Sequence, residues 1–249
     1  MRMTFTLITI TLNAQERLPR CIKSVLEQTT PPDEYVFVDG GSTDGTLGII
    51  DEAIPRLAEK GIEARLLRQV HKTGSAGIPE AWNQGIASAH GDVIALLNSD
   101  DFYAPNAIEK VVAAFSDYPS AELISSPIAM VDSDGRKLYS LYPHCLCLCE
   151  IKMPLPHPGT FVRKSLYEKI GLYDERYAIS ADYDFIWRCR KTNAKIRLLE
   201  NTLVNMEAGG LANSSRKAAR RETLDIALKH SSIPLIARIA FLLRTVTGR

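Results

Sequence analysis

The chain has 249 residues, of which 45% are hydrophobic, and its formal net charge is +1. This length and composition suffice to bury the core of one large α/β domain. The balanced charge and the 7% aromatic content exclude the basic, aromatic-rich surface that nucleic-acid binding requires. The five cysteines do not form a secreted disulfide framework, so we expect a reducing, cytoplasmic compartment.

The first hundred residues alternate between predicted strands and helices. The first apolar stretch, residues 5–11, is short and interrupted by threonines, which predicts a strand and not a signal peptide. Three further strands are expected at residues 34–38, 64–69 and 93–97. Helical periodicity or an initiating proline predicts helices at residues 18–26 and 47–57 and after Pro79 and Pro105. This order predicts a doubly wound, mostly parallel sheet with helices on both faces.

The pattern changes after residue 120. Residues 123–131 and 137–142, joined by an Asp-Ser-Asp-Gly turn, predict a hairpin, and a last strand is expected at residues 196–204. A short strand follows residues 154–160, and helices are expected near residues 165–170 and at 181–191. Asn213-Ser214-Ser215 could cap a helix that runs to His230, and an apolar helix follows at residues 233–246. No run of about 18 apolar residues is present, so we expect no membrane-spanning segment.

Three cysteines alternate at positions 145, 147 and 149, so on a strand their thiols would face one way. Zinc sites usually use Cys-x-x-Cys pairs. We therefore expect these cysteines to be small buried residues and not metal ligands.

Two adjacent acids follow the fourth predicted strand, where Val93–Leu97 continues into Asn98-Ser99-Asp100-Asp101. In open sheets with helices on both faces, ligands bind beyond the carboxyl ends of the strands. Adjacent carboxylates repel each other, and a divalent cation such as Mg²⁺ or Mn²⁺ removes that repulsion and is commonly shared with substrate phosphates. The alternative is a solvated Asp-Asp turn.

The second predicted strand also ends in an acid, within the segment Val38-Asp39-Gly40-Gly41-Ser42-Thr43-Asp44-Gly45-Thr46. Its glycines let the backbone approach a ligand closely. The segment has neither the GxGxxG spacing of dinucleotide folds nor the GxxxxGK[ST] of phosphate-binding loops.

Several segments, taken in order, resemble the family 2 glycosyltransferases, which are inverting, nucleotide-sugar-dependent enzymes of the GT-A fold. The resemblance covers roughly residues 4–205. The segments are Thr9–Asn13 with the helix segment Arg20–Val25, Val38–Thr46, Gly77–Ile86, Gly91–Asp101, His157–Phe161 and Ala181–Phe185.

The resemblance implies a GT-A-like, Rossmann-like α/β fold with a C-terminal helical extension. Residues 1–104 would form the nucleotide-sugar-binding half and residues 105–205 the acceptor-binding half. Residues 206–249 would form a lid loop and the helical extension.

On the donor side, the resemblance implies that Thr11, Asn13 and Asp39 line the nucleotide base pocket. An acid suits position 39 because a uracil ring offers an N–H donor. Asp100 would face the ribose or the metal, and Asp101 would bind Mn²⁺ or Mg²⁺, which neutralises the leaving diphosphate. The alternative for Asp39 is an Asx residue that stabilises its own turn.

On the acceptor side, Asp182 matches the general base of the family. It would take the proton of an acceptor hydroxyl as that oxygen attacks the anomeric carbon opposite the leaving nucleotide, which inverts the configuration. Asp184 is the weaker candidate for the base. The alternative for Asp182 is the N-cap of the following helix.

Four further residues are candidates by position in the family pattern. His157 precedes Pro158-Gly159 on the acceptor side, although a lone histidine is as often structural. Glu207 lies where relatives often have a mobile, glycine-containing loop, and it could substitute for a metal-binding histidine, or water could complete the metal shell. Arg216 and Lys217 could meet the diphosphate when a lid closes, or they belong to a solvated or membrane-facing surface.

The resemblance thus implies an inverting enzyme that moves a sugar from a UDP-linked donor to a glycan or lipid-linked acceptor in cell-envelope polysaccharide biosynthesis. The apolar residues 235–244, with two arginines, could lie on the inner face of the membrane or pack against a second copy in a homodimer. One rival is a sugar nucleotidyltransferase, which needs a glycine-rich basic loop where this chain has Leu12–Arg17. The other is a non-catalytic nucleotide-sugar-binding or scaffold subunit.

Overall fold

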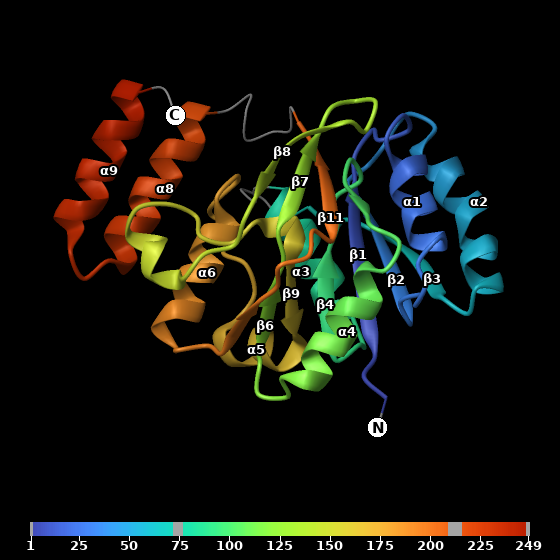
Figure 1. Cartoon of the computed structure of the whole chain (residues 1–249). Coiled ribbons are helices and arrows are strands. Elements are labelled where there is room, and N and C mark those ends of the chain that lie inside the picture. Colours follow the sequence, from blue (N-terminus) through green and yellow to red (C-terminus); the bar gives the residue numbers. More distant parts are fainter. Residues whose placement is uncertain (1, 72–76, 209–215, 248–249) are drawn as a thin grey trace.

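The fold is taken from a computed structural model that describes residues 2–71, 77–208 and 216–247. Its main sheet has seven strands in the order β10-β6-β9-β4-β1-β2-β3 (Figure 1). Neighbouring strands run parallel except for β9, which is antiparallel to both β4 and β6. The predicted mostly parallel sheet is therefore confirmed. The strands are β1 (Phe5–Thr11), β2 (Glu34–Asp39), β3 (Glu63–Arg68), β4 (Val93–Leu96), β6 (Leu123–Ser125), β9 (Thr160–Arg163) and β10 (Ile196–Leu198).

Helices cover both faces of this sheet, as the sequence predicted. The first group is α1 (Leu18–Leu26), α2 (Thr46–Glu59) and α4 (Ala107–Asp117), and the second is α3 (Ile78–Ser88), α5 (Lys164–Ile170) and α6 (Ala181–Lys191). Two more helices, α8 (Arg216–His230) and α9 (Pro234–Thr247), lie beyond α6 at the end of the molecule opposite α1 and α2 (Figure 1).

Side chains of one strand alternate between two hydrophobic cores. Phe5 and Leu7 of β1 pack in the core that contains α1, α2 and α4, whereas Ile8 packs in the core that contains α3 and α6. In β2, Phe37 and Val38 divide in the same way. Because both faces of β2 and β4 are buried, Tyr35–Val38 and Val93–Leu96 are continuous apolar runs in the sequence.

A second, four-stranded sheet lies against the main one, with the order β5-β11-β7-β8. Its strands are β5 (Phe102–Tyr103), β7 (Ile128–Val131), β8 (Lys137–Leu141) and β11 (Val204–Glu207). The predicted hairpin is confirmed for β7 and β8, which pair antiparallel.

Two predicted strands are wrong in their extent, because each divides between the two sheets. Residues 123–131 form β6 and β7, interrupted at Ser126-Pro127, where the Pro127 nitrogen has no hydrogen to donate to a ladder. Residues 196–207 form β10 in the main sheet and β11 in the small one. Pro127 stands at the first break and the polar residues Glu200 and Asn201 at the second, but neither signal says to which sheet the following residues belong.

The cysteine run is also not a strand. Residues Leu146–Glu150 form a short 3₁₀ helix, in which Cys149 is buried while Cys145 and Cys147 are exposed. All five cysteines of the chain are free thiols. The expectation of three thiols facing one way is wrong, because a 3₁₀ helix does not alternate its side chains between two faces. The expectation that they are buried is wrong for Cys145 and Cys147 and holds for Cys149 alone.

Helices α8 and α9 pack against the core that contains α3 and α6. Ile226 and Ala227 of α8 and Ala237 of α9 are buried there together with residues of α6. Within the described residues, no helix combines the length and the apolar character needed to cross a bilayer. The predicted cap at residues 213–215 lies outside the described residues.

Gly91 precedes β4 at a point where the chain touches β1. A Cβ atom there would lie 2.7 Å from the backbone nitrogen of Thr6, closer than packed atoms come. We expect Gly91→Ala to lower the free energy of unfolding by about 1–3 kcal/mol, because the backbone must shift. Gly48→Ala on α2 is the control, since nothing lies within 4 Å of a Cβ atom placed there. This change should raise the free energy of unfolding by about 0.5–1 kcal/mol. Denaturant unfolding measures both, and equal effects would contradict the packing at Gly91.

Candidate functional site

The ends of β1 and β2 form the first part of the site. Thr11 pairs with Asp39 in the parallel ladder, and its hydroxyl donates to Asp39 Oδ1 at 3.1 Å. Asn13 follows with a φ of 49°, in the left-handed region that asparagine tolerates. Its amide donates to Ser42 Oγ at 2.9 Å, and its side-chain oxygen accepts from the amide of Thr43 at 2.9 Å. The structure therefore brings the three predicted nucleotide residues together at one edge.

Asp39 stabilises the loop that follows it. One oxygen accepts from the amides of Gly41 and Ser42, both at 3.0 Å, and the other accepts from the hydroxyls of Ser42 and Thr11. Burial alone would raise the pKa of Asp39, but these hydrogen bonds outweigh it and lower the pKa. A carboxylate has about four acceptor positions, so a base N–H would have to share an oxygen that is already bonded. In this structure Asp39 therefore acts as an Asx residue that stabilises its own turn, which was the alternative to a role in base binding.

The acidic pair follows β4, which lies beside β1. Asp101 is 1% exposed, and neither carboxylate oxygen has a hydrogen-bond partner among the described residues. Burial and then the negative charge of Asp100 raise the pKa of Asp101 well above its usual range, and the backbone amide of Glu207, which makes no hydrogen bond of normal geometry to it, opposes this only in part. Burial likewise raises the pKa of Asp100. A buried carboxylate without partners, beside a second one, matches what a divalent cation would bind.

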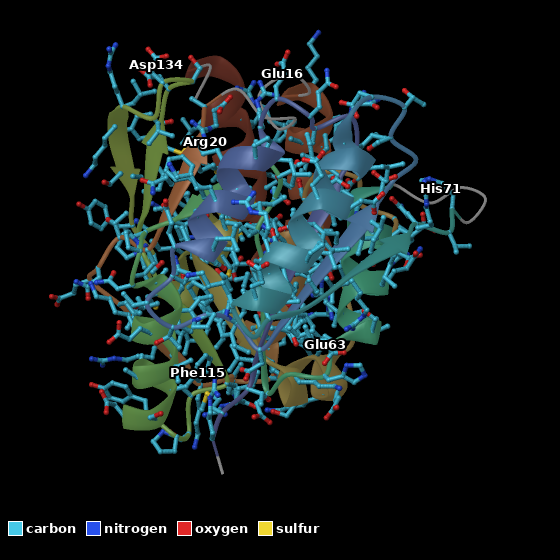
Figure 2. The ribbon with its side chains drawn as sticks, turned by 90° about the vertical axis from the view of Figure 1, so that its right-hand side faces the viewer. Glu16, Arg20, Glu63, His71, Phe115 and Asp134 are labelled. Atoms are coloured by element: carbon cyan, nitrogen blue, oxygen red, sulfur yellow. The ribbon has the colours of Figure 1, made fainter. Side chains whose placement is uncertain are left out.

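Glu207 is the last residue of β11. The prediction that it lies in a loop is therefore wrong. It is buried, and its two oxygens pair with Arg17 Nε at 2.9 Å and with Arg20 Nη2. Arg20 also donates to the carbonyl oxygen of Ser133 at 3.2 Å. In Figure 2, Arg20 on α1 lies beside the turn that carries Asp134. Glu207 thus ties the small sheet to α1, and two arginines occupy its oxygens.

The acidic pair does not by itself supply a full set of metal ligands. In residues 2–71, 77–208 and 216–247, no three His, Cys, Asp or Glu side chains are arranged to hold a metal ion. Asp100 and Asp101 would supply two oxygen ligands, and water or phosphate oxygens could complete the shell, as they commonly do for Mg²⁺.

Asp182 is the second residue of α6. The N-cap of this helix is Ser180, so the alternative that Asp182 caps the helix is wrong. Its Oδ1 accepts from the amide of Tyr183 at 2.8 Å. Burial raises the pKa of Asp182 to about 6, and the negative charge of Glu222 adds to this effect. A carboxylate with such a pKa is suited to accept a proton near neutral pH.

Asp184 has a structural role. Its oxygens accept from Arg188 Nε at 2.8 Å and from Lys229 Nζ at 2.9 Å, and they lie 2.8 Å from His230 Nε2. Burial opposes ionisation, but the hydrogen bonds from these three residues lower the pKa of Asp184 far below its usual range. Asp184 therefore joins α6 to α8 and is not available as a base.

His157 lies in an aromatic cluster next to α6. Its ring stacks on Trp82 at 4.3 Å, and Trp82 contacts Tyr173 at 5.1 Å. Burial lowers the pKa of His157 to about 4, so the ring is neutral at pH 7. His157 Nε2 and Trp82 Nε1 are buried without a hydrogen-bond partner among the described residues. The cluster therefore has both a packing role and two polar atoms that a ligand could bind.

The two basic candidates of the C-terminal segment are less informative. Arg216 begins α8, but its side chain lies outside the described residues. Lys217 is exposed, and among the described residues no ion pair or hydrogen bond connects it to Asp100 or Asp101.

Sequence reasoning did not identify Arg17, Arg20, Ser42 and Trp82 as site residues. Arg17 is the N-cap of α1 and Arg20 lies three positions later in its first turn, and this spacing was an available signal. The role of Ser42 depends on contact with Asn13, a residue 29 positions earlier. No local pattern predicts such a contact.

Comparison with known proteins gives a consistent result. The sequence model described as Glycosyl transferase family 2 matches residues 6–219. A PGL/p-HBAD biosynthesis glycosyltransferase of Mycobacterium bovis is 32% identical over 213 residues, which cover 84% of this chain and 79% of that protein. The amylovoran biosynthesis glycosyltransferase AmsE of Erwinia amylovora is 23% identical over 243 residues, covering 93% of this chain and 88% of that protein.

Among solved structures, residues 1–349 of TarS from S. aureus in complex with UDP match with a TM-score of 0.68 and 19% identity. The match covers 98% of this chain and 72% of that one, whereas the chain covers only 43% of a longer TarS structure. At this identity the match shows the shared fold alone.

Proposed function

Because the chain belongs to Glycosyl transferase family 2 and is a glycosyltransferase with a GT-A-like fold, we propose that it transfers a sugar from a UDP-linked donor with inversion. The observation that carries this proposal is the buried, unpartnered Asp101 carboxylate beside Asp100. It lies at the same sheet edge as Thr11 and Asp39, the last residues of β1 and β2. Ligands of such sheets bind at this edge. Residues 1–104 would hold the donor, residues 105–205 the acceptor, and residues 206–249 would form a lid loop and a helical extension.

The names of relatives support the donor and acceptor classes. TarS has been solved in complex with UDP and with UDP-GlcNAc, and relatives are named for PGL/p-HBAD and for amylovoran biosynthesis. We accordingly assign the chain a glycan or lipid-linked saccharide acceptor in cell-envelope polysaccharide or glycolipid synthesis.

Asp100 and Asp101 would hold Mn²⁺ or Mg²⁺, which when bound neutralises the charge of the diphosphate leaving group. The protein itself supplies the remaining functions. The loop built on Asp39 orients the nucleotide base, with Thr11 and Asn13 lining it. The neutral ring of His157 offers Nε2 to an acceptor hydroxyl.

Asp182 would act as the general base. Its ionised carboxylate takes the proton of the acceptor hydroxyl while the hydroxyl oxygen bonds to the anomeric carbon. The bond from that carbon to the diphosphate oxygen breaks on the opposite face, and the electron pair leaves with UDP. One displacement of this kind converts an α-linked donor into a β-linked product.

Substitution of the two acids separates binding from catalysis. We expect Asp101→Ala to abolish Mn²⁺-dependent UDP binding in calorimetry, since the buried ligand is lost. Asp182→Asn should retain that binding and lose at least about 100-fold in kcat, because the amide cannot accept the proton. A donor screen by thermal shift in Mn²⁺ selects the nucleotide sugar for the transfer assay.

A non-catalytic scaffold is the alternative that this experiment excludes or establishes. It would bind UDP with metal and show no turnover with any donor, and Asp182→Asn would change nothing. A normal kcat in Asp182→Asn would remove Asp182 from the mechanism.

The pH dependence of kcat/KM should report the proposed base. Asp182 is active when ionised, so kcat/KM should fall about tenfold per pH unit below about pH 6, following its raised pKa of about 6. UDP affinity, measured over the same pH range, is the control for loss of donor binding. The ordinary pKa of an aspartate carboxyl is about 4. An acid limb of kcat/KM centred there would contradict the assignment of Asp182 as the base.

For the C-terminal helices we propose contact with the inner, cytoplasmic face of an anionic membrane. Leu235, Ile239, Leu242 and Leu243 of α9 are 47–65% exposed and lie on one side of the helix at spacings of four, seven and eight. Residues 216–249 contain eight Lys and Arg against two Asp and Glu, a net charge of +6, while the whole chain has +1. An apolar helix face within a basic segment suits an anionic lipid surface.

Vesicle sedimentation tests this contact. The protein should bind phosphatidylglycerol vesicles and not neutral phosphatidylcholine vesicles, and the double substitution Ile239→Glu with Leu242→Glu should abolish binding. Leu138→Glu is the control, because Leu138 is an exposed apolar residue of β8. If the double variant instead dissociates a dimer and the wild type ignores vesicles, a second copy covers this face and the membrane proposal is wrong.

A further inference from the structure

Three consecutive backbone amides before α6 converge on one carboxylate of α8. Glu222 Oε1 accepts from the amide of Ala178 at 3.0 Å, and Oε2 accepts from Ile179 at 2.9 Å and from Ser180 at 2.8 Å. Ser180 is the N-cap of α6, two residues before Asp182. Glu222 therefore holds the segment that leads directly into the proposed base.

Other residues on the same side of α8 hold the same point. The hydroxyl of Ser180 donates to the carbonyl oxygen of Ala219 at 3.3 Å and lies 3.5 Å from Thr223 Oγ1. Positions 219, 222 and 223 are spaced by three and four residues, so they share one helix side. Two turns later, Lys229 reaches Asp184. Contacts from α8 thus hold both Ser180, which precedes α6, and Asp184 in its first turn.

The charge of Glu222 also acts on Asp182. The groups that face Asp182 are Glu222 from α8, Tyr173 from the preceding loop, and backbone amides at the start of α6. The amides favour the ionised carboxylate, whereas the negative charge of Glu222 disfavours it. Glu222 thereby offsets part of the positive potential that a helix N-terminus would impose on a carboxylate.

We propose that Glu222 is a positioning residue for the glycosyl transfer: by binding the three amides of residues 178–180, it sets the place of Asp182 at the start of α6. The inference rests on the proposed role of Asp182 as the base. It gives the C-terminal helix α8 a part in the reaction, although none of its residues is placed against substrate.

Two variants of Glu222 and one matched control test this inference. In Glu222→Gln the side-chain oxygen can still accept two of the three amides, so the fold is retained while the charge is lost. Glu222→Ala removes all three hydrogen bonds. Asp225→Asn is the control, since it removes the same charge from an exposed position of the same helix. The melting temperature is measured for each variant.

The first readout needs no substrate. The carboxyl pKa of Asp182 is followed by ¹³C NMR on Asp-labelled protein, with the resonance assigned through Asp182→Asn. In Glu222→Gln this pKa should shift to lower pH, because a neighbouring negative charge is removed. In Asp225→Asn it should stay at the wild-type value.

The second readout is kinetic. The acid limb of kcat/KM should move to lower pH in Glu222→Gln. In Glu222→Ala kcat should fall by about 10-fold or more, because the base is displaced, while KM for the donor stays within about 2-fold of wild type, which is less than 0.5 kcal/mol. This division separates positioning of the base from a general loss of structure.

Two results would overturn the inference. One is an Asp182 pKa and a kcat in both Glu222 variants that match those of Asp225→Asn. The other is a lowered melting temperature alone, which would make Glu222 only a structural contact. If Asp182→Asn keeps its kcat, the proposed function fails, but the NMR titration still decides whether Glu222 controls the Asp182 carboxyl.

Discussion

Both faces of the main sheet are covered by helices, and this burial confines the polar chemistry of the chain to the edge where the strands end. β1, β2 and β4 are neighbours in the sheet and end at the same edge. Residues 11–13, 39–42 and 98–101 therefore meet there although they are far apart in the sequence. The position of the site is a consequence of the strand order, and its chemistry comes from the side chains that follow each strand.

Carboxylates in this protein differ in function according to the partners that their burial allows. Asp39 and Asp184 are buried with several donors and are held ionised, so both serve to stabilise structure. Asp101 and Asp182 are enclosed with too few donors, and their pKa values are raised. The proposed chemistry depends on these two, because a cation can bind to Asp101 and a substrate proton can bind to Asp182.

The predicted strands have the wrong extent where the chain passes from one sheet to the other. Residues 123–131 and 196–204 are each predicted as one strand, and the structure divides each between two sheets. Periodicity reports that a residue is buried, not which sheet buries it. Glu207 was misplaced for the same reason, because β11 exists only through its pairing with β5 and β7.

The sequence by itself determined the alternation of strands and helices, the parallel sheet, the acids at the strand ends and the family to which the chain belongs. These features depend on local composition and order, which the sequence states directly. Only the tertiary structure decided that Asp39 is saturated with hydrogen bonds, that Glu207 is paired with Arg17 and Arg20, and that Glu222 supports Asp182. Each of these depends on a contact between distant parts of the chain, and its effect on a pKa depends on burial, which no local pattern specifies.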